Sequence, residues 1–305
     1  MSFITNIRSV AKYESKILVR SWFFRIFTLL AVVFLGFFNF AMMLMEDNFG
    51  LWFAKSVSSN IPYLNLLLLN TGQAVVAVFL SSEFLKRYKK LDTSEVFYVR
   101  PLSNAEYVVG KIWGNLRVFL FLNLLVLAIV LAFNFMASGV TVDLPVYLVY
   151  FFLISIPTLI FIIGLSIFLM LLLKNQALTF ILLLGYIGLT LFYIQDKFYY
   201  LFDYMVYNLP LFKSTIVGFS NLELILNHRA IYFFAGLGFI FFTIFLFKRL
   251  PNARRSHYPW LFLSFCMFLL MVTAGFRHVR SILREGEMRA LYTSINNKYV
   301  YEPKM

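Results

Sequence analysis

Long apolar runs alternate with short polar segments along most of the chain. A helix that crosses a bilayer needs about 20 mainly apolar residues, and seven runs meet or approach that length. The runs are Trp22–Met45, Ile61–Ser82, Val118–Val142, Leu144–Leu173, Ala177–Gln195, Ala230–Phe247 and Tyr258–Phe276. This pattern predicts an all-α polytopic transmembrane bundle, with six core spans in residues 22–250 and a further helix in residues 251–276. Only Lys174-Asn175-Gln176 separates the fourth run from the fifth, which predicts a tight helical hairpin.

The composition agrees with a lipid-embedded fold. Of 305 residues, 61% are hydrophobic and 13% are charged, whereas soluble domains carry roughly 25% charged residues. The net charge of +13 would also suit a nucleic-acid-binding protein, but such a protein gathers Lys and Arg on one solvated face. Here these residues lie between the apolar runs. We therefore expect membrane lipids as partners and no nucleic acid.

The distribution of basic residues predicts the orientation of the bundle. On the side of the amino terminus they fill segments 8–25, 86–117, 174 and 248–255. The opposite loops hold only Lys55, Lys197, Lys213 and Arg229. Loops rich in Lys and Arg stay in the cytoplasm, so a cytoplasmic amino terminus is predicted.

The carboxy-terminal residues 277–305 disagree with this rule, because their arginines would lie outside. Either the seventh run does not cross, or the tail leads into a translocated domain, on which loop charge has little influence; we favour the second. Tyr292–Ile295 and Lys298–Tyr301 flank Asn296-Asn297, a pattern that predicts a β-hairpin. The tail is therefore expected to be extramembrane, and either to be the start of a further domain or to pack on a partner.

The richest polar segment is residues 83–114, between the second and third runs. Asp92 or Thr93 caps a short helix with Glu95 in its first turn, where a carboxylate suits the helix dipole. Pro101 ends that helix, because the residue before a proline is pushed out of helical geometry. Val96, Phe97 and Tyr98 lie on it among charges. It is either an interfacial loop whose aromatic rings enter the headgroups, or a docking site for a cytoplasmic partner.

A second cap follows at once. Ser103 and Glu106 have the spacing of a capping box. From there one helix can run unbroken to about Ala137. Its length of roughly 50 Å exceeds the ~30 Å hydrocarbon core, so its first turns are predicted to project into the cytoplasm.

This polar segment resembles the loop between the second and third helices of type-2 ATP-binding-cassette permeases. The resemblance rests on the stretch EFLKRYKKLDTSEVFYVRPLSNAEYVVGKIWG, and Asn104 also fits the family pattern. The matching motif positions are Glu83, Pro101, Ser103, Tyr107, Gly110 and Lys111. It extends over residues 1–250, including an amphipathic elbow helix in residues 1–21. The seventh run and the tail depart from a six-span permease and resemble longer bacterial permeases with a periplasmic carboxy-terminal domain.

The resemblance implies a function, partners and a location. The chain would be the permease subunit of an exporter in the bacterial cytoplasmic (inner) membrane, forming a homodimer or heterodimer with a second permease copy. A separate cytoplasmic ATP-binding-cassette ATPase would push on the short helix of residues 92–99. The implied coupling residues are Asp92, Thr93, Glu95, Val96, Phe97 and Tyr98.

The segment of residues 196–229 combines too many charges to span with too many aromatic residues for a free loop. One interpretation is an interfacial belt of aromatic rings. By the resemblance, it forms a pair of short re-entrant helices that close the outer mouth, and both interpretations can hold together. The implied gate residues are Tyr199, Tyr200, Tyr204 and Pro210.

Catalytic chemistry is not indicated within the chain. Gly110-Lys111 lacks the other residues of a phosphate-binding loop, and His228, His257 and His278 share no metal-ligand spacing. We expect no enzyme activity, metal or cofactor. Rival functions are a secondary transporter, which would need ionisable groups at mid-membrane, and an anchor for a periplasmic domain. The mid-span amides, such as Asn70, Gln73 and Asn123, are predicted to make interhelical hydrogen bonds.

Overall fold

The fold is a helical bundle of the multi-span membrane type, seen in a computed structural model. The structure describes residues 3–44, 59–82, 102–136, 142–194, 197–207, 209, 211, 213–214, 218–219, 221–247 and 258–300. Seven helices among these residues are long and apolar enough to cross a membrane, which confirms the predicted fold class.

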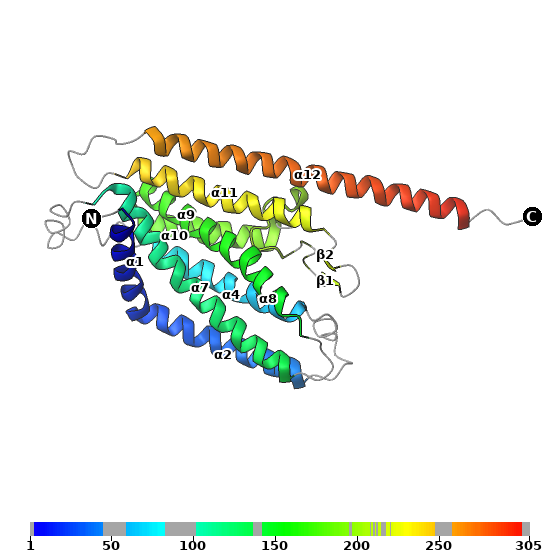
Figure 1. Cartoon of the computed structure of the whole chain (residues 1–305), viewed down its shortest axis with the longest axis horizontal. Helices are drawn as coiled ribbons and strands as arrows, with labels where there is room; N and C mark the ends of the chain where they lie inside the picture. The colour runs from blue at the N-terminus through cyan, green and yellow to red at the C-terminus, as the bar shows by residue number, and fades with distance from the viewer. Residues whose placement is uncertain are drawn as a thin grey trace, which may run out of the picture.

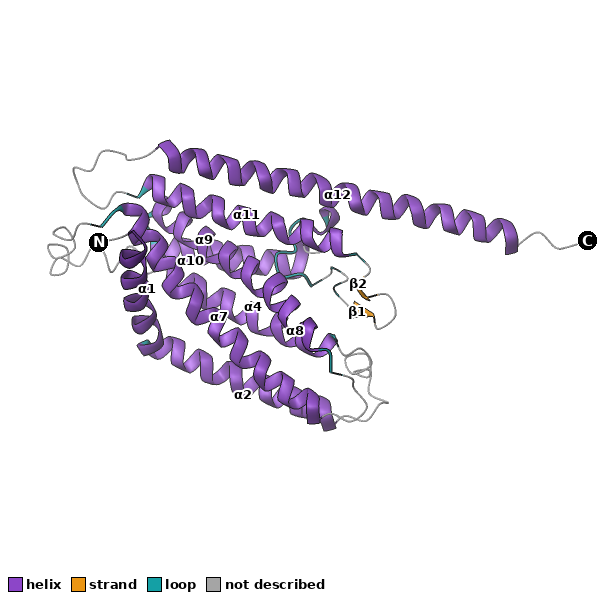
Figure 2. Ribbon diagram, viewed as in Figure 1, coloured by secondary structure: helices purple, strands orange, loops and turns teal. Residues whose placement is uncertain are grey.

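Most of the helices run side by side (Figures 1 and 2). In chain order the spanning elements are α2 (Trp22–Leu44), α4 (Asn60–Ser82), α7 (Asn104–Met136), α8 (Leu144–Tyr150) with η1 (Phe151–Ser155) and α9 (Ile156–Leu173), α10 (Gln176–Leu189) with η2 (Thr190–Ile194), α11 (Leu222–Leu246) and α12 (Tyr258–Val300). The amino-terminal helix α1 (Phe3–Arg20) instead crosses one end of the bundle (Figure 1). We call this end the α1 end.

Between η2 and α11 the chain forms no long helix in its described residues. It contains a short 3-10 turn, η3 (Phe198–Tyr200), and a two-residue antiparallel pair of β1 (Lys213–Ser214) with β2 (Gly218–Phe219). The described residues there fold as turns and a two-residue strand pair, and the expected pair of short re-entrant helices is not seen among them.

The tight hairpin between the fourth and fifth runs is confirmed. Lys174 ends α9 in the left-handed conformation, with φ 54°, and its N–H bonds to the carbonyl of Met170. Asn175 then caps α10, because its side chain accepts hydrogen bonds from the N–H groups of Ala177 and Leu178. The two polar residues satisfy backbone groups that the ends of two helices would otherwise leave open.

Amide side chains join the spans inside the bundle, as predicted. Asn39 and Asn65 exchange hydrogen bonds of 2.7 and 3.1 Å between α2 and α4. Asn123 of α7 donates to Gln73 of α4 at 2.7 Å and accepts from Ser155 of η1 at 2.8 Å. In a medium without water, such bonds satisfy polar groups that would otherwise stay unpaired.

The helices α7 and α12 are longer than the bilayer requires. The 33 residues of α7 run without interruption from Asn104, as expected from the Ser103 cap. The 43 residues of α12 give a length of roughly 65 Å, and its second half projects beyond the bundle at the end opposite α1 (Figure 1). The helix continues across residues 276 and 277, where the sequence predicts the end of the seventh span and the start of the tail.

The predicted β-hairpin in the tail is wrong, because α12 continues through Asn296-Asn297 to Val300. An isolated hairpin is only marginally stable. A helix that already exists extends by one hydrogen bond per residue without a new nucleation cost. The preformed span therefore favours continued helix over the hairpin.

The helical tail can be tested at Gly286, which is exposed on α12 and has open space where a Cβ would be. We expect Gly286→Ala to stabilise the projecting helix by about 0.5–1 kcal/mol. Hydrogen exchange of the amides at residues 292–300 would then slow, whereas exchange of these amides would be unchanged in a hairpin that begins at Tyr292.

Candidate functional site

Two polar regions at opposite ends of the bundle are built from residues that the sequence singled out. We call the first the elbow corner; it comprises α1, residues 102–117 and Phe247. The second is the infolded segment, which comprises the described residues 197–207, 209 and 211 and lies among α4, α9, α11 and α12.

The elbow corner begins with the predicted capping box. The backbone N–H of Ser103 donates to Glu106 Oε2 at 2.6 Å, and the N–H of Glu106 donates to Ser103 Oγ at 3.2 Å. The other carboxylate oxygen of Glu106 accepts a bond of 2.9 Å from Asn6 Nδ2 of α1. One buried carboxylate therefore caps α7 and also holds α1 against it.

Two motif residues tie α7 to the end of α11. Asn104 Nδ2 donates to the carbonyl of Phe247 at 2.8 Å, and the Tyr107 ring stacks on the Phe247 ring at 5.7 Å between centroids. The first turn of α7 is thus held on two sides, by α1 and by α11.

Glycines let α1 approach α7 closely. A Cβ at Gly110 would lie 2.7 Å from Val10 Cβ, and one at Gly114 would lie 2.8 Å from the carbonyl oxygen of Ala11. Small residues spaced by four allow helix backbones to approach in this way. Ser15 Oγ uses the short distance to donate to the carbonyl of Gly114 at 2.6 Å.

The last motif residue, Lys111, makes a buried ion pair. Its Nζ lies 3.4 Å from Glu14 Oε1 of α1, and the two side chains are 5% and 8% exposed. Lys111 also donates to the Tyr107 hydroxyl at 3.4 Å. The described residues of the motif therefore turn inward and fasten α7 to α1 and α11.

Gly114→Val is expected to separate α1 from α7, because the new side chain would meet the backbone of Ala11 and Cβ of Glu14. Trypsin should then cut the protein in detergent faster at Arg8, Lys12 or Lys16, by about tenfold, since a closely packed core rejects added volume. Gly188→Val on α10 is the matched control, because its Cβ would meet nothing within 4 Å. Equal cleavage rates in the two variants would contradict this packing.

The infolded segment is fastened to the bundle through its own backbone carbonyls. His278 Nε2 donates to the carbonyl of Tyr199 at 2.9 Å, and His228 Nε2 donates to that of Tyr200 at 3.0 Å. Three tyrosine hydroxyls bind further carbonyls of the segment: Tyr232 to Leu201, Tyr63 to Val206 and Tyr150 to Leu211. The donors come from α4, α8, α11 and α12, so the segment is held from several directions.

A left-handed turn directs the first of these carbonyls inward. Phe198, Tyr199 and Tyr200 have φ values of 52°, 58° and 61°. This conformation costs roughly 1–2 kcal/mol for each non-glycine residue and persists only where the surroundings hold it. Here His228 and His278 hold it; both are 0% exposed, and their ring centroids are 5.0 Å apart.

Arg229, which is 2% exposed, lies at the centre of the hydrogen bonds that hold the infolded segment in the bundle. Its Nε donates to the carbonyl of Leu153 at 2.6 Å, and its Nη2 donates to that of Ile154 at 3.2 Å and to Thr158 Oγ1 at 2.8 Å. Its Nη1 reaches the carbonyl of Tyr204 in the infolded segment at 2.9 Å. A single guanidinium therefore joins α11, η1, α9 and the infolded segment.

The free carbonyls that Arg229 binds arise from the π-helical turn η1. Pro157 has no N–H to donate to the carbonyl of Leu153, four residues earlier, and a π turn also shifts the helical bonding pattern. Arg229 supplies the missing donor. A proline inside an apolar run was the sequence signal that could have predicted such an acceptor.

The placement of Arg229 in an outer loop was wrong. The sixth helix starts at Leu222 rather than near Ala230, so residues 222–229 of the predicted outer segment are helical. Arg229 and His228 fall inside α11 because their polar groups find acceptors in the bundle. A prediction of spans from runs of apolar residues leaves His228 and Arg229 out, because both are polar.

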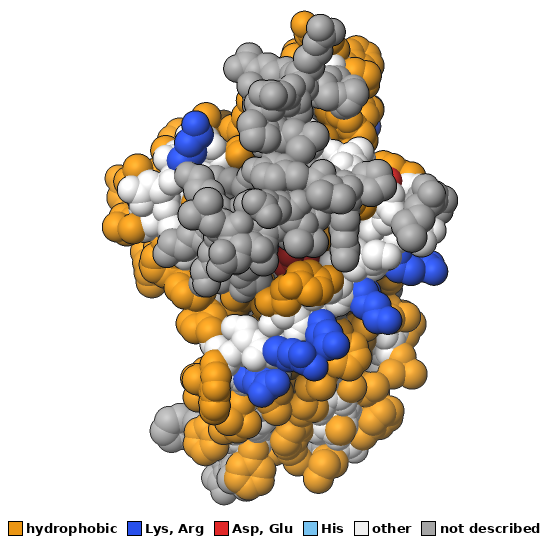
Figure 3. Space-filling model, turned by 90° about the vertical axis from the view of Figure 1, so that its left-hand side faces the viewer, with side chains coloured by type: hydrophobic (Ala, Val, Ile, Leu, Met, Phe, Trp, Pro, Cys, Tyr) orange, Lys and Arg blue, Asp and Glu red, His pale blue; other side chains and the backbone are white. Residues whose placement is uncertain are grey.

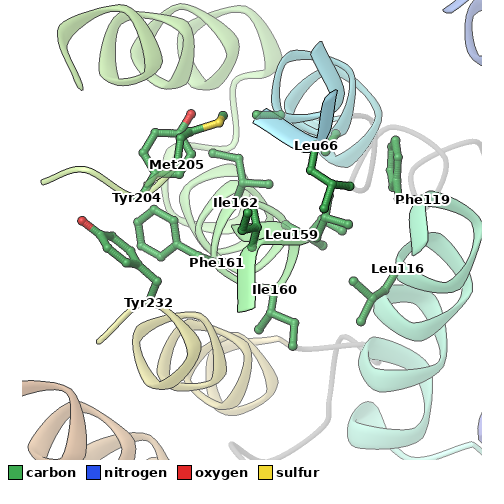
Figure 4. Packing of buried hydrophobic residues seen from close by; sticks show 14 of the residues in the cluster. Leu66, Leu116, Phe119, Leu159, Ile160, Phe161, Ile162, Tyr204, Met205 and Tyr232 are labelled. Carbon is green, nitrogen blue, oxygen red and sulfur yellow. The ribbon is translucent and has the colours of Figure 1, made fainter. Parts of the chain in front are cut away.

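The predicted gate residues differ in position. Tyr204 is buried and packs against Phe161 and Tyr232, at ring-centroid distances of 5.9 and 6.3 Å (Figure 4). Tyr199 is 47% exposed and contributes its carbonyl rather than its ring. Burial raises the pKa of Tyr204 above its ordinary value, so its phenol stays neutral.

Several predicted site residues lie outside the described residues, and so does the short helix expected at residues 92–99. They are Glu83, Asp92, Thr93, Glu95, Val96, Phe97, Tyr98, Pro101 and Pro210. The described part of the chain contains no group of His, Cys, Asp and Glu that could hold a metal ion.

Comparisons with known proteins add no identification. The chain matches no protein-family model, and a search of curated proteins finds no match.

Proposed function

We propose that this chain is the membrane permease subunit of an ATP-driven exporter, working with a separate cytoplasmic ATPase and a second permease copy. The observation that carries the proposal is the elbow corner. Four described motif residues, Asn104, Tyr107, Gly110 and Lys111, join the start of α7 to α1 or to Phe247 at the end of α11. Ser103 caps the same helix, directly after the segment to which a partner would bind. A push on residues 92–99 would move α7 together with both neighbours.

The opposite end of the bundle supports the same mechanism. The infolded segment closes that end through buried hydrogen bonds to α4, α8, α9, α11 and α12. Opening a path would require these helices to separate and release the carbonyls. Work delivered at the α1 end would supply that energy, with the amino terminus in the cytoplasm. The core amides Asn123 and Gln73 bond to neighbouring elements and hold the helices together.

Coupling can be tested at the short helix. Glu95→Lys or Phe97→Pro is expected to abolish transport-linked ATP hydrolysis while the bundle stays folded, because both residues fall between α4 and α7 in the sequence. The measurement is ATPase activity of the reconstituted complex, with melting temperature as the control for folding. Unchanged substrate-stimulated hydrolysis in both variants would refute the coupling role.

A second candidate is a membrane anchor for an extramembrane domain. The projecting half of α12 favours it, because this part of the 43-residue helix extends past the bundle (Figure 1). Deleting residues 287–305 distinguishes the two functions. A permease would keep ATPase coupling after the deletion, whereas an anchor would lose all function.

A further inference from the structure

A row of exposed cations runs along α1. Arg8, Lys12, Lys16 and Arg20 follow one another at every fourth position, which places them on one side of the helix. All four are exposed. The row spans about 18 Å, and Figure 3 shows Lys and Arg side chains crossing the α1 end between apolar ones.

The row has no acidic side chain of its own helix to neutralise it. Glu14 is the only acidic residue in α1, and it is buried in the ion pair with Lys111. The charge that α1 presents outward is therefore entirely positive. Such a surface fits a partner with several negative groups at short intervals.

Two tryptophans at the same corner identify the kind of partner. Trp22, where the apolar helix α2 begins, is 77% exposed, and Trp113, beside Gly114 on α7, is 48% exposed. Exposed Trp side chains next to spanning helices prefer the headgroup level of a bilayer. Arg20 lies two residues before Trp22, so the cation row ends where the hydrocarbon core begins.

We infer that the row of Arg8, Lys12, Lys16 and Arg20 binds the phosphate groups of anionic phospholipids in the membrane leaflet at the α1 end. These lipids hold α1 flat on the headgroups and stabilise its packing against α7. This inference does not depend on ATP-driven transport. It depends only on the membrane-spanning fold and on the charge of α1.

The test compares lipid selectivity in two matched variants of the full chain. The first carries Arg8→Gln, Lys12→Gln and Lys16→Gln. The second carries Arg277→Gln, Arg280→Gln and Arg284→Gln, which removes the same charge from exposed residues of α12. Native mass spectrometry would measure the ratio of bound phosphatidylglycerol to bound phosphatidylcholine from micelles with equal amounts of both.

We expect the unaltered chain and the α12 variant to prefer phosphatidylglycerol equally. In the α1 variant, the ratio of bound phosphatidylglycerol to bound phosphatidylcholine should be lower by a factor of about five or more. Equal losses in both variants would show a general charge effect and overturn the inference. Full retention of the preference for phosphatidylglycerol in the α1 variant would also overturn the inference. Equal binding of the two lipids by the unaltered chain, together with binding of an acidic polyglutamate peptide to α1, would overturn it as well. If the triple α1 variant does not fold, Lys12→Gln alone should give a smaller loss in the same direction, and no loss there would contradict the inference.

Discussion

Arg229→Met is expected to lower the free energy of unfolding by about 3–5 kcal/mol, among the largest effects of any single substitution. The change leaves the carbonyls of Leu153, Ile154 and Tyr204 without their shared donor. These groups are buried where water cannot replace the lost bonds. Denaturation in mixed micelles would measure the loss.

Two further variants make the Arg229 result specific. Arg229→Lys should lose an intermediate amount, because an ammonium group cannot reach acceptors arranged around a planar guanidinium. Arg277→Met, on the exposed surface of α12, should change stability by less than about 0.5 kcal/mol. If Arg229→Met unfolds at the same denaturant concentration as Arg277→Met, the infolded segment is not held as described.

The second large effect is expected at the buried ion pair of the elbow corner. Lys111→Met removes the ammonium group that faces the buried carboxylate of Glu14, and Glu14→Leu removes the carboxylate that faces the buried ammonium group of Lys111. Removing one partner of a buried pair costs about 3–5 kcal/mol. The double variant Lys111→Met with Glu14→Leu should recover most of that loss, because no charge then stays buried. A double-mutant cycle on unfolding free energies would measure the coupling.

A matched pair exists at the opposite end of the bundle. Lys213 and Asp143 also form an ion pair, but both side chains are 29% exposed. Solvent screening should limit the coupling of that pair to about 1 kcal/mol or less. Additive effects at Lys111 and Glu14, or a coupling no larger than that of Lys213 and Asp143, would disprove the importance of the buried pair.

The spans were predictable because a bilayer imposes a simple demand on sequence. Every backbone group must be bonded within the segment, so a run of apolar residues has few alternatives to a helix. The Ser103–Glu106 cap was predictable for a related reason, since both partners are three residues apart. The hairpin at Lys174 and Asn175 likewise depends on neighbouring residues.

The anchorage of the infolded segment could not be predicted in the same way. Its acceptors are backbone carbonyls, which every residue carries, and its donors lie up to 143 positions away, as between Tyr63 and Val206. Only the folded arrangement brings His278 to Tyr199 or Arg229 to Leu153. The tail was mispredicted because Asn296-Asn297 is a local turn signal, whereas the helix before it is a stronger constraint.

Under the proposed function, the residues around Ser103–Lys111 directly follow the segment to which an ATPase would bind. The structure adds that the same residues build a close contact with α1. The proposed function requires such a contact, because a helix that receives force must be attached to what it moves.

The central claim, that this bundle is the permease of an ATP-driven transporter, is most directly tested by purifying the full chain from its membrane in mild detergent and identifying its stoichiometric partner. The account predicts a subunit with a phosphate-binding-loop ATPase domain, whose hydrolysis in proteoliposomes is abolished by Phe97→Pro on this chain. A chain that purifies without such a subunit, and on which no ATP hydrolysis in its membrane depends, would contradict it.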